Sequence, residues 1–273
     1  MSFITLTTDF GLSDAYVAVM KGVILSINPD VRIIDISHNI KAGHIAHAGY
    51  VLKEACPFFP KGTIHVAVVD PGVGNARRPV IVVTDDYFFV GPDNGIFWPI
   101  ITTCGPSEII HLTKPEFFLS AISKTFHGRD IFAPVAAHLS KGYEPKKMGL
   151  IIKDPVKLEI KTPRKKGNIL FGEVIRVDHF GNIITNISNK VLGRFLKGSK
   201  PVIKAGDLII KDIVNSYSEA GMGEALVLIG SSDYLEIAVN RGRAADFIGI
   251  APYKIMGTEI EVRRNTNPIT RTN

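Results

Sequence analysis

Cysteine is scarce in this chain, and long apolar runs are absent. The 273 residues include only Cys56 and Cys104, which form no CxxC pair, so neither a disulfide framework nor a zinc site is expected. His44 and His47 are interpreted as helix surface, because two histidines without a third ligand are weak evidence for a metal. No apolar run approaches the roughly 18 residues of a membrane-spanning helix, and residues 1–9 lack a secretory-signal pattern. We therefore expect a cytoplasmic protein with no membrane partner.

Nucleic-acid modules and phosphate-binding loops are also missing. The pair Gly72 and Gly74 lacks the third glycine of a dinucleotide fingerprint, and no Walker pattern occurs. The net charge of +6 comes largely from residues 161–167 and from the tail around Arg263. Because no aromatic residues are interleaved with these charges, a solvated linker and tail explain them better than a nucleic-acid partner does.

What the chain does contain is 45% hydrophobic residues, enough for one large core or two modest ones. Up to residue 160, strand-like and helix-like segments alternate, which predicts an α/β domain with a largely parallel sheet flanked by helices. The expected strands are 2–8, 31–36, 63–69, 80–84 and 87–90. The expected helices are 16–27 (with Ser13-Asp14 as its cap), 43–55 and 131–139.

The pattern changes after a basic, proline-containing linker at residues 161–167. Short strand candidates, separated by turns rich in Gly, Asn, Asp and Ser, then predict a smaller all-β, barrel-like domain at 168–260. Residues 261–273 are expected to form a polar tail. The strand candidates are 169–177, 183–187, 202–203, 208–210, 225–229 and 234–239.

The most informative segment is 70–74, with the sequence DPGVG, which closes the strand candidate at 63–69. It places the Asp70 carboxylate and a rigid turn where a buried strand ends, and Arg77 follows closely. In open α/β sheets, ligand sites gather beyond the carboxyl ends of the strands. The segment therefore predicts an active-site loop, although by itself it does not name the reaction.

Other segments allow both a functional and a purely structural interpretation. Asp9, after the first strand, suits a ribose diol, or it organises the turn before the helix. Residues 125–130 bring His127 close to an arginine and a carboxylate. Taken alone, that segment is better explained by a helix cap at Asp130 with a histidine in the core.

The second half offers polar groups at two turns. Asp178 and Asn182 lie at one hairpin tip and suit an amine or a purine edge, but turn chemistry alone explains an isolated hairpin. The segment that begins at Asn240 can present backbone polar groups to a base, with Tyr217 available for stacking.

In their order along the chain, these segments are far more specific than any one of them. They read TTDFG followed by Ser13-Asp14, VDPGVG at 69–74, GPDNG at 91–95, FHGRD at 126–130, DHFGN at 178–182 and NRG at 240–242. This series resembles the S-adenosylmethionine hydroxide adenosyltransferases, relatives of the fluorinase and chlorinase enzymes, over residues from about 3 to 255.

The resemblance implies attack by water or hydroxide on the ribose C5′ of S-adenosylmethionine, which gives adenosine and methionine without a cofactor. It also implies a homotrimer whose active sites lie between the N-terminal domain of one subunit and the C-terminal domain of its neighbour. The family's water-activating triad falls on Asp70, Arg77 and His127. The implied substrate-binding positions are Asp9, Asp178, Asn182, Tyr217, Ser231 and Asn240.

The departures from the halogenating relatives are also informative. Fluorinases carry a tyrosine at the position of Asp70 and an aromatic residue at that of Gly43. The serine that contacts fluoride in them corresponds to Gly128, so a halide site is not expected here. They also contain an inserted loop in the region matching residues 74–92, which this chain lacks.

The expected division of roles follows from ordinary side-chain chemistry. His127 has the pKa best suited to take a proton from water, Arg77 can stabilise developing hydroxide, and Asp70 can orient Arg77 and the water. The alternative function is a non-catalytic sensor of S-adenosylmethionine or adenosine. A sensor would have little use for these three side chains together, so an enzyme is the favoured hypothesis.

Overall fold

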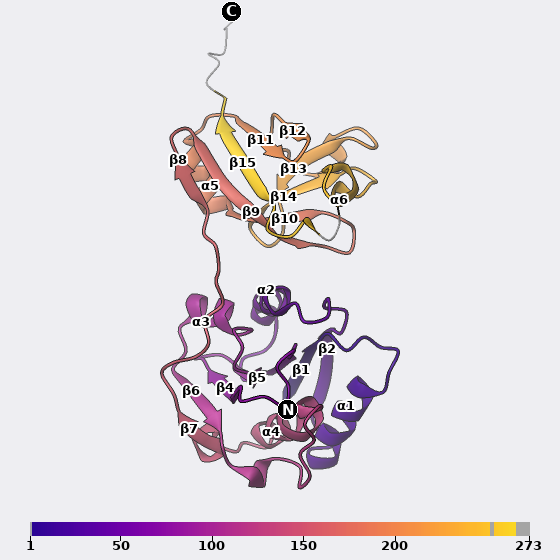
Figure 1. Cartoon of the computed structure of the whole chain (residues 1–273), viewed down its shortest axis with the longest axis vertical. Helices are drawn as coiled ribbons and strands as arrows, with labels where there is room; N and C mark the ends of the chain where they lie inside the picture. Colours follow the sequence, from indigo (N-terminus) through magenta and orange to yellow (C-terminus); the bar gives the residue numbers. More distant parts are fainter. Residues whose placement is uncertain (1, 252–253, 266–273) are drawn as a thin grey trace, which may run out of the picture. The chain divides into compact units, whose positions relative to one another are not determined.

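The computed structural model of the chain describes residues 2–251 and 254–265. The chain divides into two compact units, residues 1–159 and 160–273, each with its own hydrophobic core (Figure 1). Among the described residues, no helix has both the length and the apolar character needed to span a membrane.

The first unit alternates strands and helices. Its strands are β1 (Phe3–Thr8), β2 (Arg32–Ser37), β3 (Ile64–Val68), β4 (Pro79–Val83), β5 (Phe88–Pro92), β6 (Glu108–Leu112) and β7 (Gly149–Ile151). Its helices are α1 (Tyr16–Ile27), α2 (Ile45–Ala55), α3 (Trp98–Cys104) and α4 (Ala133–Ser140), the last preceded by a π-helical turn, η3 (Gly128–Phe132).

The sheet of this unit places the ends of β1 and β3 side by side. Its strand order is β2-β1-β3-β5-β4-β6-β7, with β2, β1, β3 and β5 parallel, which confirms the predicted α/β architecture. Helices α1 and α4 pack on one face, and α2 and α3 on the other (Figure 1). The chain leaves β1 toward β2 on one side and returns to β3 on the other. The carboxyl ends of β1 and β3 therefore flank a topological switch point, where open α/β sheets bind ligands.

The core of this sheet holds a buried histidine whose titration should affect stability. His65 on β3 is fully buried, its Nδ1 lies 2.7 Å from Thr5 Oγ1, and its ring stacks on Phe89. Burial lowers the pKa of His65 to about 4, whereas the unfolded chain retains a value near 6.5.

Acidification from pH 7 to pH 4 should therefore destabilise the protein through His65. Between these two pKa values only the unfolded state binds the proton, so the free energy of unfolding falls with decreasing pH, by about 3 kcal/mol for this residue. Urea unfolding of the wild type and of His65→Leu at both pH values measures the effect. The variant should lose about 3 kcal/mol less than the wild type on acidification. Equal losses in the two proteins would contradict the prediction.

The second unit is an all-antiparallel, nearly closed barrel-like sheet, as predicted. Its strand order is β12-β11-β15-β9-β10-β14-β13, with β8 paired to β9. The strands are β8 (Arg164–Lys166), β9 (Ile169–Val177), β10 (Ile183–Ser188), β11 (Pro201–Ala205), β12 (Leu208–Ile210), β13 (Ala225–Ile229), β14 (Tyr234–Val239) and β15 (Glu259–Arg264). The helices are α5 (Asn189–Leu196) and α6 (Ala244–Phe247).

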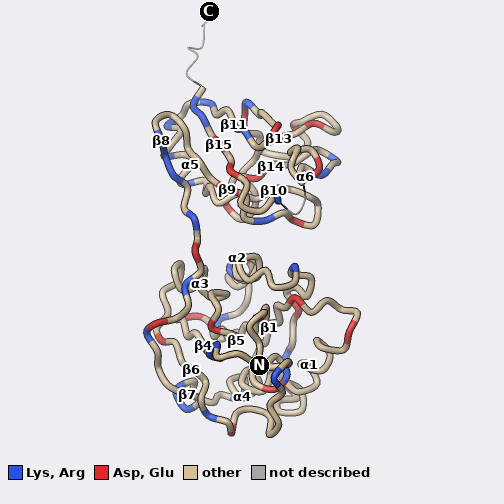
Figure 2. The backbone as a smooth tube through the Cα atoms, in the orientation of Figure 1, with Lys and Arg blue, Asp and Glu red and all other residues tan. Residues whose placement is uncertain are grey.

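The predicted linker and tail boundaries are wrong. Within the predicted linker, 161–167, the basic strand β8 pairs with β9, and it is drawn blue in Figure 2. Its charged side chains mark it as an edge strand rather than as a solvated connection. The predicted tail, 261–273, begins inside β15, where Ile260 and Val262 are fully buried and alternate with charged residues.

Some local predictions also need correction. Helix α1 is preceded by Ala15 and has no side-chain cap, so the predicted cap at Ser13-Asp14 does not form. His44 is not on the helix surface as predicted but caps α2, its side chain accepting from the backbone N–H of His47. Helix α5, capped by Ser188, was not predicted, because eight residues carry too short a periodic pattern.

Candidate active site

Asp70, Arg77 and His127 form one hydrogen-bonded cluster in the first unit. Asp70 follows β3, Arg77 precedes β4, and His127 immediately precedes η3. Arg77 Nε donates to Asp70 Oδ2 at 2.8 Å, and Arg77 Nη2 donates to the same oxygen. Arg77 Nη2 also lies 2.7 Å from His127 Nδ1. The three residues that the sequence links by resemblance are therefore in direct contact.

A glycine allows the two loops of the cluster to approach each other. Gly74 has a φ of +79°, in the left-handed region that favours glycine. A Cβ at this position would lie 2.3 Å from the carbonyl oxygen of Lys124. The loop that carries Asp70 and Arg77 can therefore pack against the segment that leads to His127 only if residue 74 has no side chain.

The ion pair of the cluster is buried, and it has spare hydrogen-bonding capacity. The side chains of Asp70 and Arg77 are 5% and 9% exposed, and the guanidinium lies 5.2 Å from the centre of the Phe132 ring. Within the part of the chain that the structure describes, Asp70 Oδ1 and Arg77 Nη1 are buried without a hydrogen-bond partner. Buried polar atoms are rarely left unpaired, so these two atoms are unused hydrogen-bonding capacity within the cluster.

The surroundings of His127 determine which ring nitrogen carries its proton. Burial lowers the pKa of His127, and Arg77 lowers it further, while Asp70 and Asp130 act in the opposite direction. A guanidinium can only donate, so His127 Nδ1 accepts from Arg77 and the hydrogen of the neutral ring is on Nε2. This geometry disagrees with the expectation that His127 takes the proton of the water, because neither nitrogen is then free to accept one.

A cavity of about 130 Å³ adjoins the cluster. Asp9, Asp70 and His127 all line it, together with Phe10 and Gly43. Asp9 Oδ2 also accepts from the backbone N–H of Gly43 at 2.8 Å. This contact joins the loop after β1 to the segment before α2, 34 residues further along the chain, and the Asp9 side chain also lines the cavity.

The second unit contains a larger cavity of about 620 Å³. Among its lining residues are four of the predicted substrate-binding positions, Asp178, Asn182, Tyr217 and Ser231. The backbone N–H of Asn182 donates to Asp178 Oδ1 at 2.8 Å, and Asn182 Nδ2 donates to Asp178 Oδ2 at 3.0 Å. The pair thus stabilises its own hairpin tip while it forms part of the cavity wall.

Asn240 is not among the residues that line this cavity, and its role in substrate binding stays a prediction. Its side-chain amide donates to the carbonyl oxygen of Ala220 at 2.7 Å, and its backbone N–H donates to the carbonyl oxygen of Glu224. The cavity wall is formed instead by the next two residues, Arg241 and Gly242. Arg241 adopts a left-handed φ of +57°, a strained conformation often found at functional sites.

Two residues of this cavity were missed by sequence reasoning. Glu236 on β14 is buried, and its Oε1 accepts from the Tyr217 hydroxyl at 2.6 Å. Burial raises the pKa of Glu236, with Asp178 acting in the same direction, and it raises that of Tyr217 to about 12. The available signal was an acidic residue inside the apolar strand candidate at 234–239. For Phe180, which is 72% exposed, the only signal in the sequence was an aromatic residue at a hairpin tip.

Across residues 2–251 and 254–265, the structure contains no group of three or more His, Cys, Asp and Glu side chains arranged to hold a metal ion.

Comparison with known proteins gives matches over nearly the whole chain. Residues 4–149 match the family model of the SAM hydroxide adenosyltransferase N-terminal domain, and residues 172–256 match that of its C-terminal domain. The chain is 36% identical to the (R)-S-adenosyl-L-methionine hydrolase of Salinispora tropica, over 92% of this chain and 95% of that protein. It is 26% identical to a fluorinase of Actinoplanes sp., over 87% of this chain and 90% of that protein.

A solved structure is similar in fold as well as in sequence. The uncharacterized conserved protein from Thermotoga maritima has a TM-score of 0.88 and 36% sequence identity, with 97% of this chain and 100% of that chain covered.

Proposed function

The chain belongs to the S-adenosylmethionine hydroxide adenosyltransferase family, and from this premise we propose that it hydrolyses S-adenosylmethionine to adenosine and methionine. The observation that carries the proposal is the buried cluster of Asp70, Arg77 and His127 beside a cavity that Asp9 also lines. A sensor would bind the same ligand without needing a buried carboxylate with a free oxygen next to a guanidinium.

The proposed reaction is a single displacement at the ribose C5′. The water oxygen forms a bond to C5′ while the C5′–S bond breaks, and its electron pair stays on sulfur. The sulfonium therefore leaves as a neutral thioether, and no general acid is required. The water loses one proton, so the products are adenosine, methionine and a proton. The difficult requirement is hydroxide at neutral pH, because bulk water has a pKa of about 15.7.

We assign the proton acceptor to Asp70 rather than to His127. Asp70 Oδ1 is buried and has no hydrogen-bond partner among the described residues, whereas Oδ2 is held by Arg77. The Arg77 guanidinium can stabilise the hydroxide as it forms. Neutral His127, which accepts from Arg77 through Nδ1, would hold the guanidinium in place and can donate from Nε2 to the attacking oxygen.

We further propose that the two cavities contribute complementary parts of the substrate site. Asp9 would bind the ribose hydroxyls in the first unit. In the second unit, the Asp178 carboxylate suits the ammonium group of methionine, and Phe180 suits stacking on adenine. A homotrimer, with each site formed by two subunits, is the assembly we propose, with no cofactor and in the cytoplasm.

The substrate is proposed to be the (R) epimer at the sulfonium sulfur, as in the name of the relative from Salinispora tropica. An enzyme restricted to one epimer would hydrolyse it without consuming the other.

Incubation of the protein with each separated epimer in H₂¹⁸O tests the proposed function. We expect adenosine and methionine in equal amounts from the (R) epimer, with ¹⁸O in the adenosine only, because water attacks carbon and the thioether leaves. Chromatography with mass detection measures both products. Measurable binding without product would favour the sensor, and label in methionine would contradict attack at C5′.

A further inference from the structure

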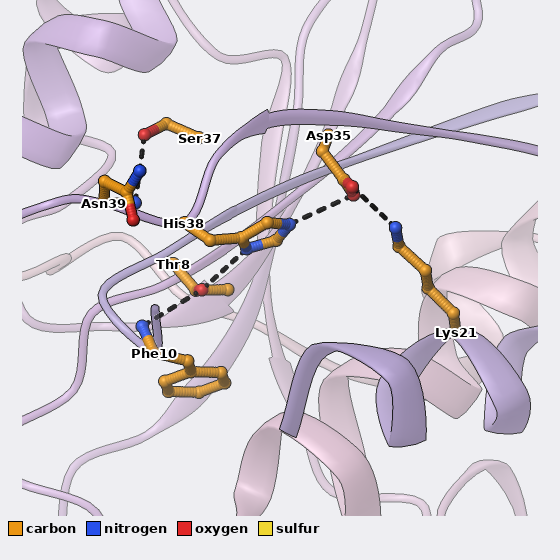
Figure 3. Close-up of polar contacts among 7 residues, drawn as sticks. All are labelled: Thr8, Phe10, Lys21, Asp35, Ser37, His38 and Asn39. Carbon is orange, nitrogen blue, oxygen red and sulfur yellow. Dashed lines mark hydrogen bonds and ion pairs between the residues drawn. The ribbon is translucent and has the colours of Figure 1, made fainter. Parts of the chain in front are cut away.

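Thr8, His38 and Asp35 form a hydroxyl–imidazole–carboxylate series, and Thr8 also contacts Phe10 (Figure 3). Thr8 Oγ1 lies 2.8 Å from His38 Nδ1. His38 Nε2 lies 3.0 Å from Asp35 Oδ1. Lys21 on α1 closes the series at the surface, with its Nζ 2.5 Å from Asp35 Oδ2.

The donor and the acceptor of each hydrogen bond in the series can be assigned. Thr8 Oγ1 accepts from the backbone N–H of Phe10 at 3.3 Å, so its own hydrogen is available to His38 Nδ1. The hydrogen of the neutral His38 ring is then on Nε2, which faces the Asp35 carboxylate. The order of groups is that of a nucleophilic triad. Here, however, Thr8 is fully buried and His38 is 4% exposed, so the hydroxyl has no access to a substrate.

The series contacts the loop at the carboxyl end of β1. The Thr8 side chain holds the N–H of Phe10, and the carbonyl oxygen of His38 accepts from the N–H of Gly11 at 2.8 Å. Asp9 lies between Thr8 and the anchored Phe10, and its carboxylate in turn accepts from the backbone N–H of Gly43. The two strands involved, β1 and the edge strand β2, are hydrogen-bonded neighbours in the sheet.

The same loop also contacts the segment that carries His127. The Phe10 ring packs edge-on against the Phe126 ring, with 5.8 Å between their centres, and both residues line the cavity beside the cluster. A displacement of the loop would therefore move the Asp9 carboxylate and the Phe10 wall of the cavity together.

We propose that Thr8, His38 and Asp35 are positioning residues that hold Asp9 in the orientation required by the ribose hydroxyls. The inference rests on the proposed function, since it assumes that Asp9 binds ribose. It extends that function to a buried series that contacts no substrate and acts only through the loop.

The first experiment compares Thr8→Val with a matched control, Thr5→Val. Thr5 is on the same strand, is equally buried, and lies 2.7 Å from a histidine Nδ1, that of His65, but it does not contact the Asp9 loop. We expect both variants to lower Tm by similar amounts. Only Thr8→Val should raise KM for S-adenosylmethionine and the Kd of adenosine measured by calorimetry, each by about tenfold, because misplaced binding groups lose affinity. Thr8→Ser, which keeps the hydroxyl, should restore both constants.

A second variant covers the case in which Thr8→Val does not fold. Asp35 is partly exposed, so Asp35→Asn should fold. It should raise KM and Kd by about threefold, because an amide interacts more weakly with His38 than a carboxylate does. Equal effects of Thr8→Val and Thr5→Val on KM and Kd would overturn the positioning role. If Thr8→Val is unfolded, unchanged KM and Kd in Asp35→Asn would overturn it. Failure of the proposed function is recognised separately, as a wild type that releases no adenosine; the Kd comparison then still decides the positioning role. A wild type that binds neither ligand would overturn both.

Discussion

Replacing Asp70 by asparagine should lower kcat by about two to three orders of magnitude, as expected for the loss of a charged group that acts in the transition state. The amide can still offer one oxygen to Arg77, so the loop should keep its shape. Its NH₂ group would then replace the free oxygen Oδ1, which places a donor where the water needs an acceptor. KM should change by less than about threefold, because Asp70 is not assigned to substrate binding.

A neighbouring ion pair provides the control. Asp93 is buried, and its Oδ2 accepts from Arg78 Nε at 2.9 Å, but it does not line the cavity beside the cluster. Asp93→Asn should therefore lower stability much as Asp70→Asn does, with kcat close to that of the wild type. If Asp70→Asn retained kcat, the proton acceptor would be another group. If both variants lost activity in parallel with stability, Asp70 would have a structural role only.

Mixed trimers of two variants, each defective in one half of the proposed site, should recover about one third of the wild-type activity, because one of their three sites then combines two intact halves. The two variants are Asp70→Asn, in the first unit, and Asp178→Asn, in the second. The prediction follows from the proposed sharing of each site between two subunits. Co-expression with two different tags and purification on both gives trimers that contain both variants, and adenosine release measures their activity.

The two parent variants, purified alone, set the background for this experiment. Mixed trimers no more active than the parents would mean that each subunit contributes both halves of its own site. Light scattering on the wild type tests the assembly directly, since a monomer in solution would contradict the proposed trimer.

The sequence pattern predicted that the chain divides into two units of different fold type. Alternating apolar segments with helical and strand periods predicted the first unit, and short apolar strands between polar turns predicted the second. The pattern did not predict two strands that are rich in charged residues. Strand β8 is entirely exposed and basic, so only its backbone pairing with β9 identifies it. Strand β15 was missed because its two buried residues are set among charged ones.

By itself, the sequence also determined which residues are candidates for the site, through the order and spacing of motifs that contain Asp9, Asp70 and His127. The tertiary structure alone decided what these side chains do to one another. His127 accepts from Arg77, across 50 residues of chain, and our assignment of the proton acceptor to Asp70 rests on this contact. The reason is physical: hydrogen-bond partners are set by the order and register of strands that are distant in sequence, and no local pattern records which strands become neighbours.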